Sequence, residues 1–362
     1  MRYLICLLLC SIAPFCFSAP NSTLLAFSDL HFNPYAACAP KKPCQLIQQL
    51  QTAPVSDWDR LLNQASTRPW ALGDDTDYTL WQNTLAELQQ REKQIHPAFI
   101  ILLGDMLAHD YRENYFLYTE HQTPAGYRCF VRKTFQYIAK TFSKRFPHTN
   151  LYPVLGNNDT YADHFDLSTQ NAITADLSKW YGYVLHNKNA RVKFAKQFNQ
   201  HGYYAYTLPG MNSIRLIAIN STPFARQAKV NVPLQNKQLA FLHFQLRLAH
   251  KHHQQALIIM HIPNNVDVYS SLKKSLMLQW QEEPSLRFNQ ELNEHAENIM
   301  GMVQEGGHDT EHMLQTAEKA ILGTIDGGAG QDALPCVTGR EMALQAAERI
   351  EKAGERKPGQ LS

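Results

Sequence analysis

Short apolar runs, each bounded by polar residues, recur along the chain between longer amphipathic stretches. Runs of this length are typical of buried strands, since a helix needs roughly ten residues or more. The predicted strands are 23–27, 98–103, 151–155, 214–219 and 256–260. The chain is therefore expected to contain buried β-sheet.

The stretches between these runs carry apolar residues at intervals of three and four, the spacing that places side chains on one face of a helix. Three groups show it: Leu80, Trp81, Leu85 and Leu88; Val131, Phe135, Ile138 and Phe142; and Leu239, Leu242, Leu246 and Ala249. Strands that alternate with helices predict a layered α/β fold. In such folds ligands bind where strands end and loops begin, so the residues directly after each strand are the first candidates for chemistry.

The composition of the chain changes near residue 300. The last aromatic residue is Phe288, although the sequence includes 17 Phe and 16 Tyr, and glycine becomes frequent from Gly301 onward. The segment 303–362 holds one predicted helix, 341–353, and a flexible glycine-rich loop, 327–330, but little that could build a core. We interpret it as a divergent tail, of the kind that a frameshift or a truncation of the gene produces.

The first residues have the organisation of a secretory signal peptide. A basic residue precedes an apolar run over 3–17, and the small residues Ser18 and Ala19 follow it. A membrane-spanning anchor is the alternative interpretation, but the run is shorter than the roughly 20 apolar residues that a bilayer requires. We therefore expect 1–19 to be a signal peptide that directs export, periplasmic or secreted, and we expect no transmembrane anchor.

Composition and charge narrow the class of protein. Charged residues make up 18% of the chain and hydrophobic residues 44%, which is ordinary for a globular protein and disfavours a disordered or fibrous one. The formal net charge is +2 and the basic residues form no concentrated stripe, so nucleic-acid binding is not implied.

Cysteine placement points to a structural disulfide. Three of the seven cysteines lie in the predicted signal peptide. Cys38 and Cys44 lie close together in a loop that contains proline and lysine. In an oxidising compartment they would bridge each other, or one of them would pair with Cys129.

Polar residues directly follow four of the predicted strands. The segments are Ser28-Asp29-Leu30-His31, Leu103-Gly104-Asp105, Gly156-Asn157-Asn158-Asp159 and His261-Ile262-Pro263. Each segment alone is a weak signal, since Asp-x-His is often a hydrogen-bonding pair and Gly-Asp is often a turn. Together they bring carboxylate, amide and imidazole groups to one edge of the sheet, which is the ligand mixture of a metal centre.

This ordered series resembles the signature of the metallophosphoesterases, which runs Asp-x-His, Gly-Asp, Gly-Asn-His-Asp/Glu, His and Gly-His-x-His. Further details resemble the branch of acid sphingomyelinase and endopolyphosphatase: His109-Asp110 shortly after Gly104-Asp105, Gly-Asn-Asn-Asp in the third segment and His-Ile-Pro in the fourth. The resemblance implies a metallophosphoesterase domain over 20–302, built as an α/β sandwich of two mixed β-sheets flanked by helices.

The resemblance also implies a centre of two divalent metal ions. Asp29 and His31 would hold the first ion, Asp105 would bridge both, and Asn157 and His261 would hold the second. Two such ions orient and deprotonate a water and stabilise the charge that develops on a phosphoryl group. The mixture of oxygen and imidazole ligands suits Zn, Mn or Fe better than Ca. The resemblance to this branch favours zinc among them.

Two further residues acquire catalytic roles through the resemblance. His109 corresponds to the family's histidine proposed to protonate the leaving oxygen, a role suited to a side chain that titrates near neutral pH. The alternative is a surface or core histidine with no part in the reaction. Asn158 stands where many relatives carry a histidine, so it would stabilise the transition state through its amide.

One part of the signature is missing. The Gly-His-x-His block should follow a strand near 299–303, where it gives one histidine to each metal, but no such sequence is present. The nearest substitutes, His308 and His312, are four residues apart instead of two and are weaker candidates for metal ligands. The C-terminal part of the second sheet is expected to be incomplete as well, because the tail lacks the aromatic residues and strands that complete it in the family.

These expectations favour a metal-dependent phosphoester hydrolase similar to acid sphingomyelinase, which uses a metal-activated water on a phosphodiester or another phosphorylated small molecule or lipid. A catalytically impaired relative, kept as a binding protein or as a damaged gene product, is the alternative from another class. Within the enzyme class an endopolyphosphatase and a nucleotide phosphohydrolase stay open, because ligand motifs do not describe the loops that select the substrate. The sequence predicts no particular oligomeric state.

Overall fold

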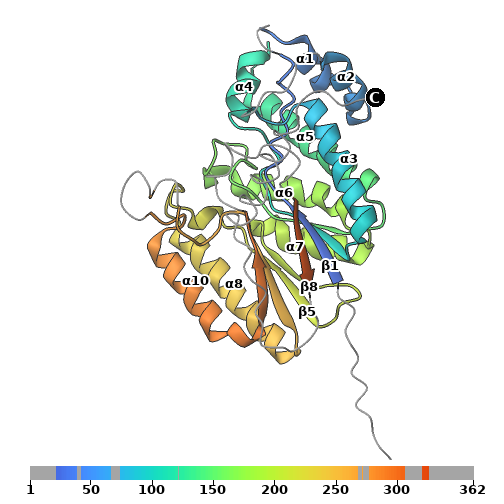
Figure 1. Cartoon of the computed structure of the whole chain (residues 1–362). Helices are drawn as coiled ribbons and strands as arrows, with labels where there is room; N and C mark the ends of the chain where they lie inside the picture. The colour runs from blue at the N-terminus through green and yellow to red at the C-terminus, as the bar shows by residue number, and fades with distance from the viewer. Residues whose placement is uncertain are drawn as a thin grey trace, which may run out of the picture.

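The computed structural model describes residues 22–38, 42–66, 74–120, 122–267, 271, 277–305 and 320–325. These residues form two four-stranded sheets flanked by helices, as Figure 1 shows. This is the layered α/β arrangement predicted from the alternation of strands and helices. The predicted signal peptide, the predicted tail helix and glycine-rich loop, and both His308 and His312 lie outside the described residues.

The first sheet has the strand order β3-β2-β1-β8. β1 (Ser22–Phe27), β2 (Phe99–Leu102) and β3 (Leu151–Pro153) are parallel to one another. β8 (Ala320–Ile325) runs antiparallel to β1. Because β1, β2 and β3 point the same way, the residues that follow them lie at one edge of the sheet.

The second sheet has the order β4-β5-β6-β7. Its strands are β4 (Tyr204–Thr207), β5 (Ile214–Ala218), β6 (Gln255–Ile259) and β7 (Ile299–Val303). β4 is antiparallel to β5, whereas β5, β6 and β7 are parallel. The carboxyl ends of β6 and β7 therefore lie side by side.

Helices cover the sheets and extend beyond the first one (Figure 1). The α-helices are α1 (Gln45–Thr52), α2 (Trp58–Ala65), α3 (Tyr78–Ile95), α4 (Tyr111–Tyr118), α5 (Pro124–Arg145), α6 (Gln170–Tyr181), α7 (Lys188–His201), α8 (Val232–Lys251) and α10 (Glu282–Glu294). Short 3-10 helices are η1 (Val55–Asp57), η2 (Leu167–Thr169), η3 (Gly182–Val184), η4 (Thr222–Phe224) and η5 (Ala296–Asn298).

Local side chains define where the long helices begin. The Asp77 carboxylate accepts a hydrogen bond of 2.7 Å from the backbone N–H of Leu80, which satisfies a donor that the first turn of α3 leaves open. α5 begins in the same way, with Thr123 as its cap and Pro124 in its first turn. The three predicted groups of apolar residues form the buried faces of α3, α5 and α8, apart from Leu80, which is only partly buried.

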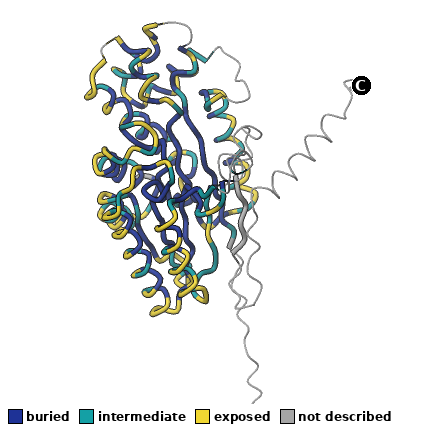
Figure 2. The backbone as a smooth tube through the Cα atoms, turned by 90° about the vertical axis from the view of Figure 1, so that its left-hand side faces the viewer, coloured by how far each residue is buried: buried dark blue, intermediate teal, exposed yellow. Residues whose placement is uncertain are grey.

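Two hydrophobic clusters hold the layers together. The larger one surrounds the first sheet and reaches the inner face of the second, where Leu257 and Ile259 of β6 contribute to it. The smaller one packs the other face of the second sheet against α8 and α10, and it contains Ile258 between those two residues. This alternation along β6 is the period of two that a strand imposes. Figure 2 shows the result, with buried backbone through the middle of the molecule and exposed segments at its periphery.

Every strand predicted from an apolar run is present, with ends that shift by at most two residues. β4 escapes this prediction because its sequence, Tyr-Ala-Tyr-Thr, alternates aromatic with small or polar residues and forms no apolar run. β8 lies in the tail, where the sequence predicted only a helix and a glycine-rich loop. It pairs with β1, so this described part of the tail adds a strand to the first sheet.

The disulfide joins Cys38 to Cys44, which confirms the first of the two predicted pairings. Cys129 is an exposed thiol on α5. Among the described residues, none of the helices has the length and apolar character that crossing a membrane requires.

Candidate metal centre

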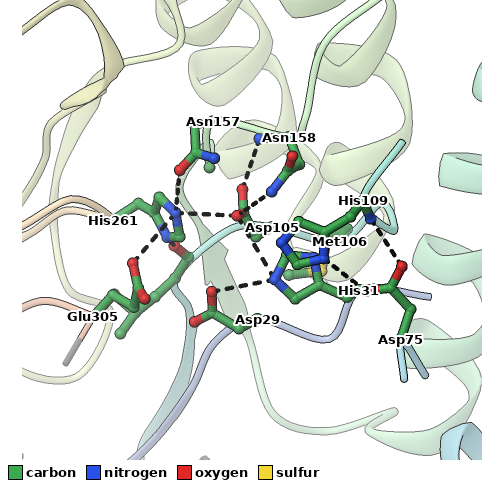
Figure 3. A network of polar contacts seen from close by, with 12 residues as sticks. Asp29, His31, Asp75, Asp105, Met106, His109, Asn157, Asn158, His261 and Glu305 are labelled. Atoms are coloured by element: carbon green, nitrogen blue, oxygen red, sulfur yellow. Dashed lines mark hydrogen bonds and ion pairs between the residues drawn. The ribbon is translucent and has the colours of Figure 1, made fainter. Parts of the chain in front are cut away.

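The ends of strands from both sheets bring the predicted polar residues together, as Figure 3 shows. Asp29 and His31 follow β1, and Asp105 follows β2. Asn157 follows β3, and His261 follows β6 of the second sheet. All five side chains are buried, with exposed fractions between 0% and 6%. Residues that are up to 232 positions apart in the chain thus form one buried cluster of polar side chains.

The backbone around this cluster adopts conformations that ordinary residues rarely take. Asp29, His31 and Asp105 have φ angles of 54°, 41° and 52°, in the left-handed region. Each such residue costs roughly 1 kcal/mol or more, and such conformations gather at functional sites. Backbone hydrogen bonds hold the strained segments: Asp29 N–H donates to Gly104 O at 3.1 Å, and His31 N–H to Asp105 O at 3.0 Å.

Asp105 lies at the centre of the cluster. Its Oδ2 is 3.4 Å from Nε2 of His261 and 3.8 Å from Nε2 of His31, so one carboxylate oxygen faces both imidazoles. Asn158 holds the carboxylate in place, because its backbone N–H donates to Oδ1 at 2.8 Å and its side-chain amide to Oδ2 at 2.6 Å. Burial alone would raise the pKa of Asp105, but His261, His31 and the hydrogen bond from Asn158 hold it far below its usual range.

Backbone carbonyls orient the two imidazoles. The Nδ1 atom of His31 lies 3.1 Å from Leu107 O, and that of His261 lies 2.9 Å from Leu103 O. When Nδ1 carries the proton and donates it to the carbonyl, Nε2 presents its lone pair, which is the arrangement that a metal-ligating histidine requires. In both residues Nε2 faces the carboxylate cluster.

The electrostatics of His261 match this arrangement. Burial would lower the pKa of the imidazole, but the nearby carboxylates of Asp105, Glu305 and Asp29 raise it well above its usual value. A positive charge at this position is therefore favoured by its surroundings. A divalent cation among the same carboxylates would supply that charge with a neutral imidazole as its ligand.

The donor set fits divalent cations. Ligand atoms of Asp29, Asp105 and His261 all lie within 4.8 Å of one another, and all three residues are buried. His31 Nε2 is 3.5 Å from Asp29 Oδ1 on one side of Asp105. On the other side His261 Nε2 is 3.0 Å from Asn157 Oδ1. Carboxylate, amide and imidazole donors at this spacing could hold first-row metal ions.

Glu305 is a member of the cluster that the sequence analysis missed. It follows β7, and its Oε2 lies 3.4 Å from Nε2 of His261, while its backbone N–H donates to His261 O at 3.0 Å. Its exposed fraction is 7%. The resemblance implies histidines of a Gly-His-x-His block in this region of the chain, and it implies no glutamate there. The signal that was available is an acidic residue two positions after a strand parallel to β6.

A second pair lies beside the cluster. The Nδ1 atom of His109 lies 2.7 Å from Oδ1 of Asp75, and the backbone N–H of His109 donates to Oδ2 at 3.0 Å. The His109 ring stacks on that of His31 with centroids 4.1 Å apart and an angle of 18°. The His109 side chain is 43% exposed, so it lies at the solvent side of the cluster. Asp75 was not predicted, because no local pattern links it to His109.

Asp159, the last residue of the third segment, has a supporting position. One carboxylate oxygen accepts the backbone N–H of Met106 at 2.8 Å and the other accepts that of Gly156 at 3.0 Å. These bonds tie the segment after β2 to the segment after β3. Burial and the Asp105 carboxylate raise the pKa of Asp159 to about 6, against the opposing effect of these hydrogen bonds.

A small hollow that is partly open to solvent adjoins the cluster at Asn158. Tyr111, Arg112, Tyr127 and His164 contribute to its lining. Of the residues that surround Asp105, Asn158 is the one that contributes to this lining.

Comparison of the chain with protein-family models and with curated proteins gives no match to either. The case for a function therefore depends on the residues of the cluster.

Proposed function

We propose that the protein is an exported, metal-dependent phosphoester hydrolase of the metallophosphoesterase type, similar to acid sphingomyelinase. The observation that carries the proposal is the Asp105 carboxylate, buried between the Nε2 atoms of His31 and His261. A carboxylate in that position can contact two cations at once. The Cys38–Cys44 disulfide supports the exported location, since disulfides persist in oxidising compartments.

The residues divide into two ligand groups that share Asp105. Asp29 and His31 would hold one ion, and Asn157, His261 and Glu305 would hold the other. Two bound ions, zinc in preference to manganese or iron, would supply an activated water and stabilise the charge that builds on the phosphoryl oxygens. The chain's part is to fix the ligands, which the hydrogen bonds to His31, His261 and Asp105 support.

Two further residues would act directly on the substrate. Asn158 adjoins both Asp105 and the hollow, so its amide is placed to donate to a phosphoryl oxygen. Since Asp75 holds Nδ1 of His109, the Nε2 atom is the ring position that would give a proton to the leaving oxygen. Asp75 would orient the ring.

Glu305 favours an active hydrolase over the impaired relative. The missing histidines would leave the ions short of ligands, but the carboxylate of Glu305 contacts His261 from the segment after β7, where those histidines were expected. The sphingomyelinase-like phosphodiesterase is our first choice, and polyphosphate and nucleotides are the other substrates to assay.

Replacement of His109 by alanine is expected to slow the hydrolysis of phosphodiesters with alkyl leaving groups by roughly 100-fold or more, the usual contribution of a general acid. Nitrophenyl esters should lose much less, because their leaving group needs no proton. Steady-state rates on the two ester classes test this. Equal losses of rate on both ester classes would show that His109 positions the substrate or supports the fold, and does not donate the proton.

Replacement of Glu305 by glutamine is expected to weaken the binding of one metal ion, because the amide lacks the charge of the carboxylate. Elemental analysis after dialysis should find less metal than in the wild type. Glu297→Gln is the matched control, since that side chain is 75% exposed and lies before β7. If His308 and His312 supply ligands instead, their double replacement by alanine lowers the metal content and Glu305→Gln does not.

A further inference from the structure

A second group of metal-ligand residues lies on the outer layer of the second sheet, away from the Asp105 cluster. Nδ1 of His243 on α8 lies 2.8 Å from Oε2 of Glu291 on α10. His295, which directly follows α10, approaches His243 edge to face with ring centroids 5.7 Å apart. One ligand atom from each residue lies within 4.8 Å of the other two.

The packing of α8 against α10 fixes the position of these side chains. Asn236, His243 and His250 are spaced by seven residues on α8, and the three contact Arg287, Glu291 and Asn298 respectively. The cluster beneath them contains Leu242, Leu246 and Phe288. Glu291 and His295 are four residues apart, the helical spacing that brings side chains to one face. α8, α10 and the residue after α10 thus bring three potential metal-ligand atoms close together.

An ion pair explains only part of this arrangement. It accounts for His243 and Glu291, but it gives no role to His295. The Nε2 atom of His295 is buried and has no hydrogen-bond partner among the described residues. A buried polar atom without a partner costs free energy. A bound cation would satisfy this nitrogen. In a tetrahedral site with metal–ligand bonds of about 2.1 Å, two ligand atoms lie about 3.4 Å apart, so the three side chains would rotate to reach that distance.

We propose that His243, Glu291 and His295 bind one divalent cation of the zinc class and that this ion ties α8 to α10. Two imidazoles and one carboxylate form a ligand set that zinc accepts with water in the fourth position. The His243 side chain is 40% exposed and that of Glu291 21%, so the site is open to solvent on one side. It is separate from the Asp105 cluster, because His295 precedes β7 and Glu305 follows it. The ion would stabilise the fold and would take no part in hydrolysis.

Zinc titration of the metal-free full chain tests the site, with bound zinc and the thermal unfolding midpoint measured together. Glu291→Gln and His295→Ala are each expected to lose one zinc ion relative to the wild type and to lose part of the zinc-induced rise in midpoint. His250→Ala is the matched control, since His250 also lies on α8 but contacts Asn298 and Glu297 of η5, outside the group of His243, Glu291 and His295. It should bind as much zinc as the wild type.

Two results would overturn the proposal. One is that both variants keep the wild-type zinc content, which reduces the cluster to an ion pair. The other is that His250→Ala loses as much zinc as they do, which points to nonspecific binding by surface histidines. Asp105→Asn separates this site from the proposed function. If it retains the zinc that His295→Ala loses, the outer site stands whatever the hydrolysis assays show.

Discussion

Asp105→Asn is expected to abolish phosphodiester hydrolysis. The substitution keeps the shape of the side chain but removes the charge that faces His31 and His261, and it puts an amide where a carboxylate would contact both cations. Metal ions contribute several kcal/mol to such reactions, which corresponds to a rate loss of roughly a thousandfold or more. Hydrolysis of bis-p-nitrophenyl phosphate by the purified proteins measures it.

A matched control is Asp57→Asn, which changes a partly exposed carboxylate, paired only loosely with Arg60, at the start of α2. It should leave both the rate and the metal content unchanged. Near-normal turnover in Asp105→Asn would refute the shared-ligand role of Asp105.

Gly156→Ala is expected to inactivate the protein through packing alone. A Cβ atom at this position would lie 1.9 Å from Asp105 Oδ1 and 2.2 Å from Asp105 N, so Asp105 would have to move. The opposing backbone cannot retreat easily, because a Cβ on Gly104 would itself lie 2.4 Å from Gly156 N. Such overpacking typically destabilises a fold by roughly 1–3 kcal/mol. Activity should fall about as far as in Asp105→Asn, and chemical denaturation should show lower stability.

Gly301→Ala provides the comparison for this variant. No atom lies within 4 Å of a Cβ built on Gly301 in β7, so the same methyl group meets open space there. Stability and activity should stay close to the wild type. Wild-type activity in Gly156→Ala would show that the position of Asp105 is not critical.

Sequence pattern was sufficient to predict that the polar segments follow strands and converge, but it placed them at one edge of one sheet, whereas His261 follows β6 of the second sheet. Apolar runs identify β1, β2, β3 and β6, and parallel strands in a layered fold place the residues after them at common edges. Asp29, Asp105 and His261 therefore meet as expected. The register of the strands matters little here, because each residue follows its strand directly.

Contacts that depend on tertiary structure could not be predicted from the sequence. Asp75 meets His109 across 34 positions, and no periodicity relates the two. Glu305 contacts His261 because β7 pairs in parallel with β6, so its role follows from the neighbouring strand and not from its own segment. The close approach of Gly104 to Gly156 likewise exists only once β2 and β3 are side by side.

The tail shows a different limit of prediction from the sequence. Its composition, with no aromatic residues and many glycines, suggested that it has no core of its own and lacks the strands that would complete the second sheet. Ala320–Ile325 nevertheless forms β8, since edge pairing with β1 requires backbone groups and a short apolar segment, not a core of its own. Composition over a long segment therefore hides a single strand within it.

The central claim is that the residues around Asp105 bind divalent cations and hydrolyse phosphodiesters with them. The most direct measurement is the rate of bis-p-nitrophenyl phosphate hydrolysis by chelator-treated protein, before and after zinc or manganese is restored, with bound metal determined in the same samples. We predict no hydrolysis without metal, and activity that returns with bound metal in the wild type but not in Asp105→Asn. Hydrolysis that persists in the metal-free protein, or none in a wild type that has regained its metal, would contradict the claim.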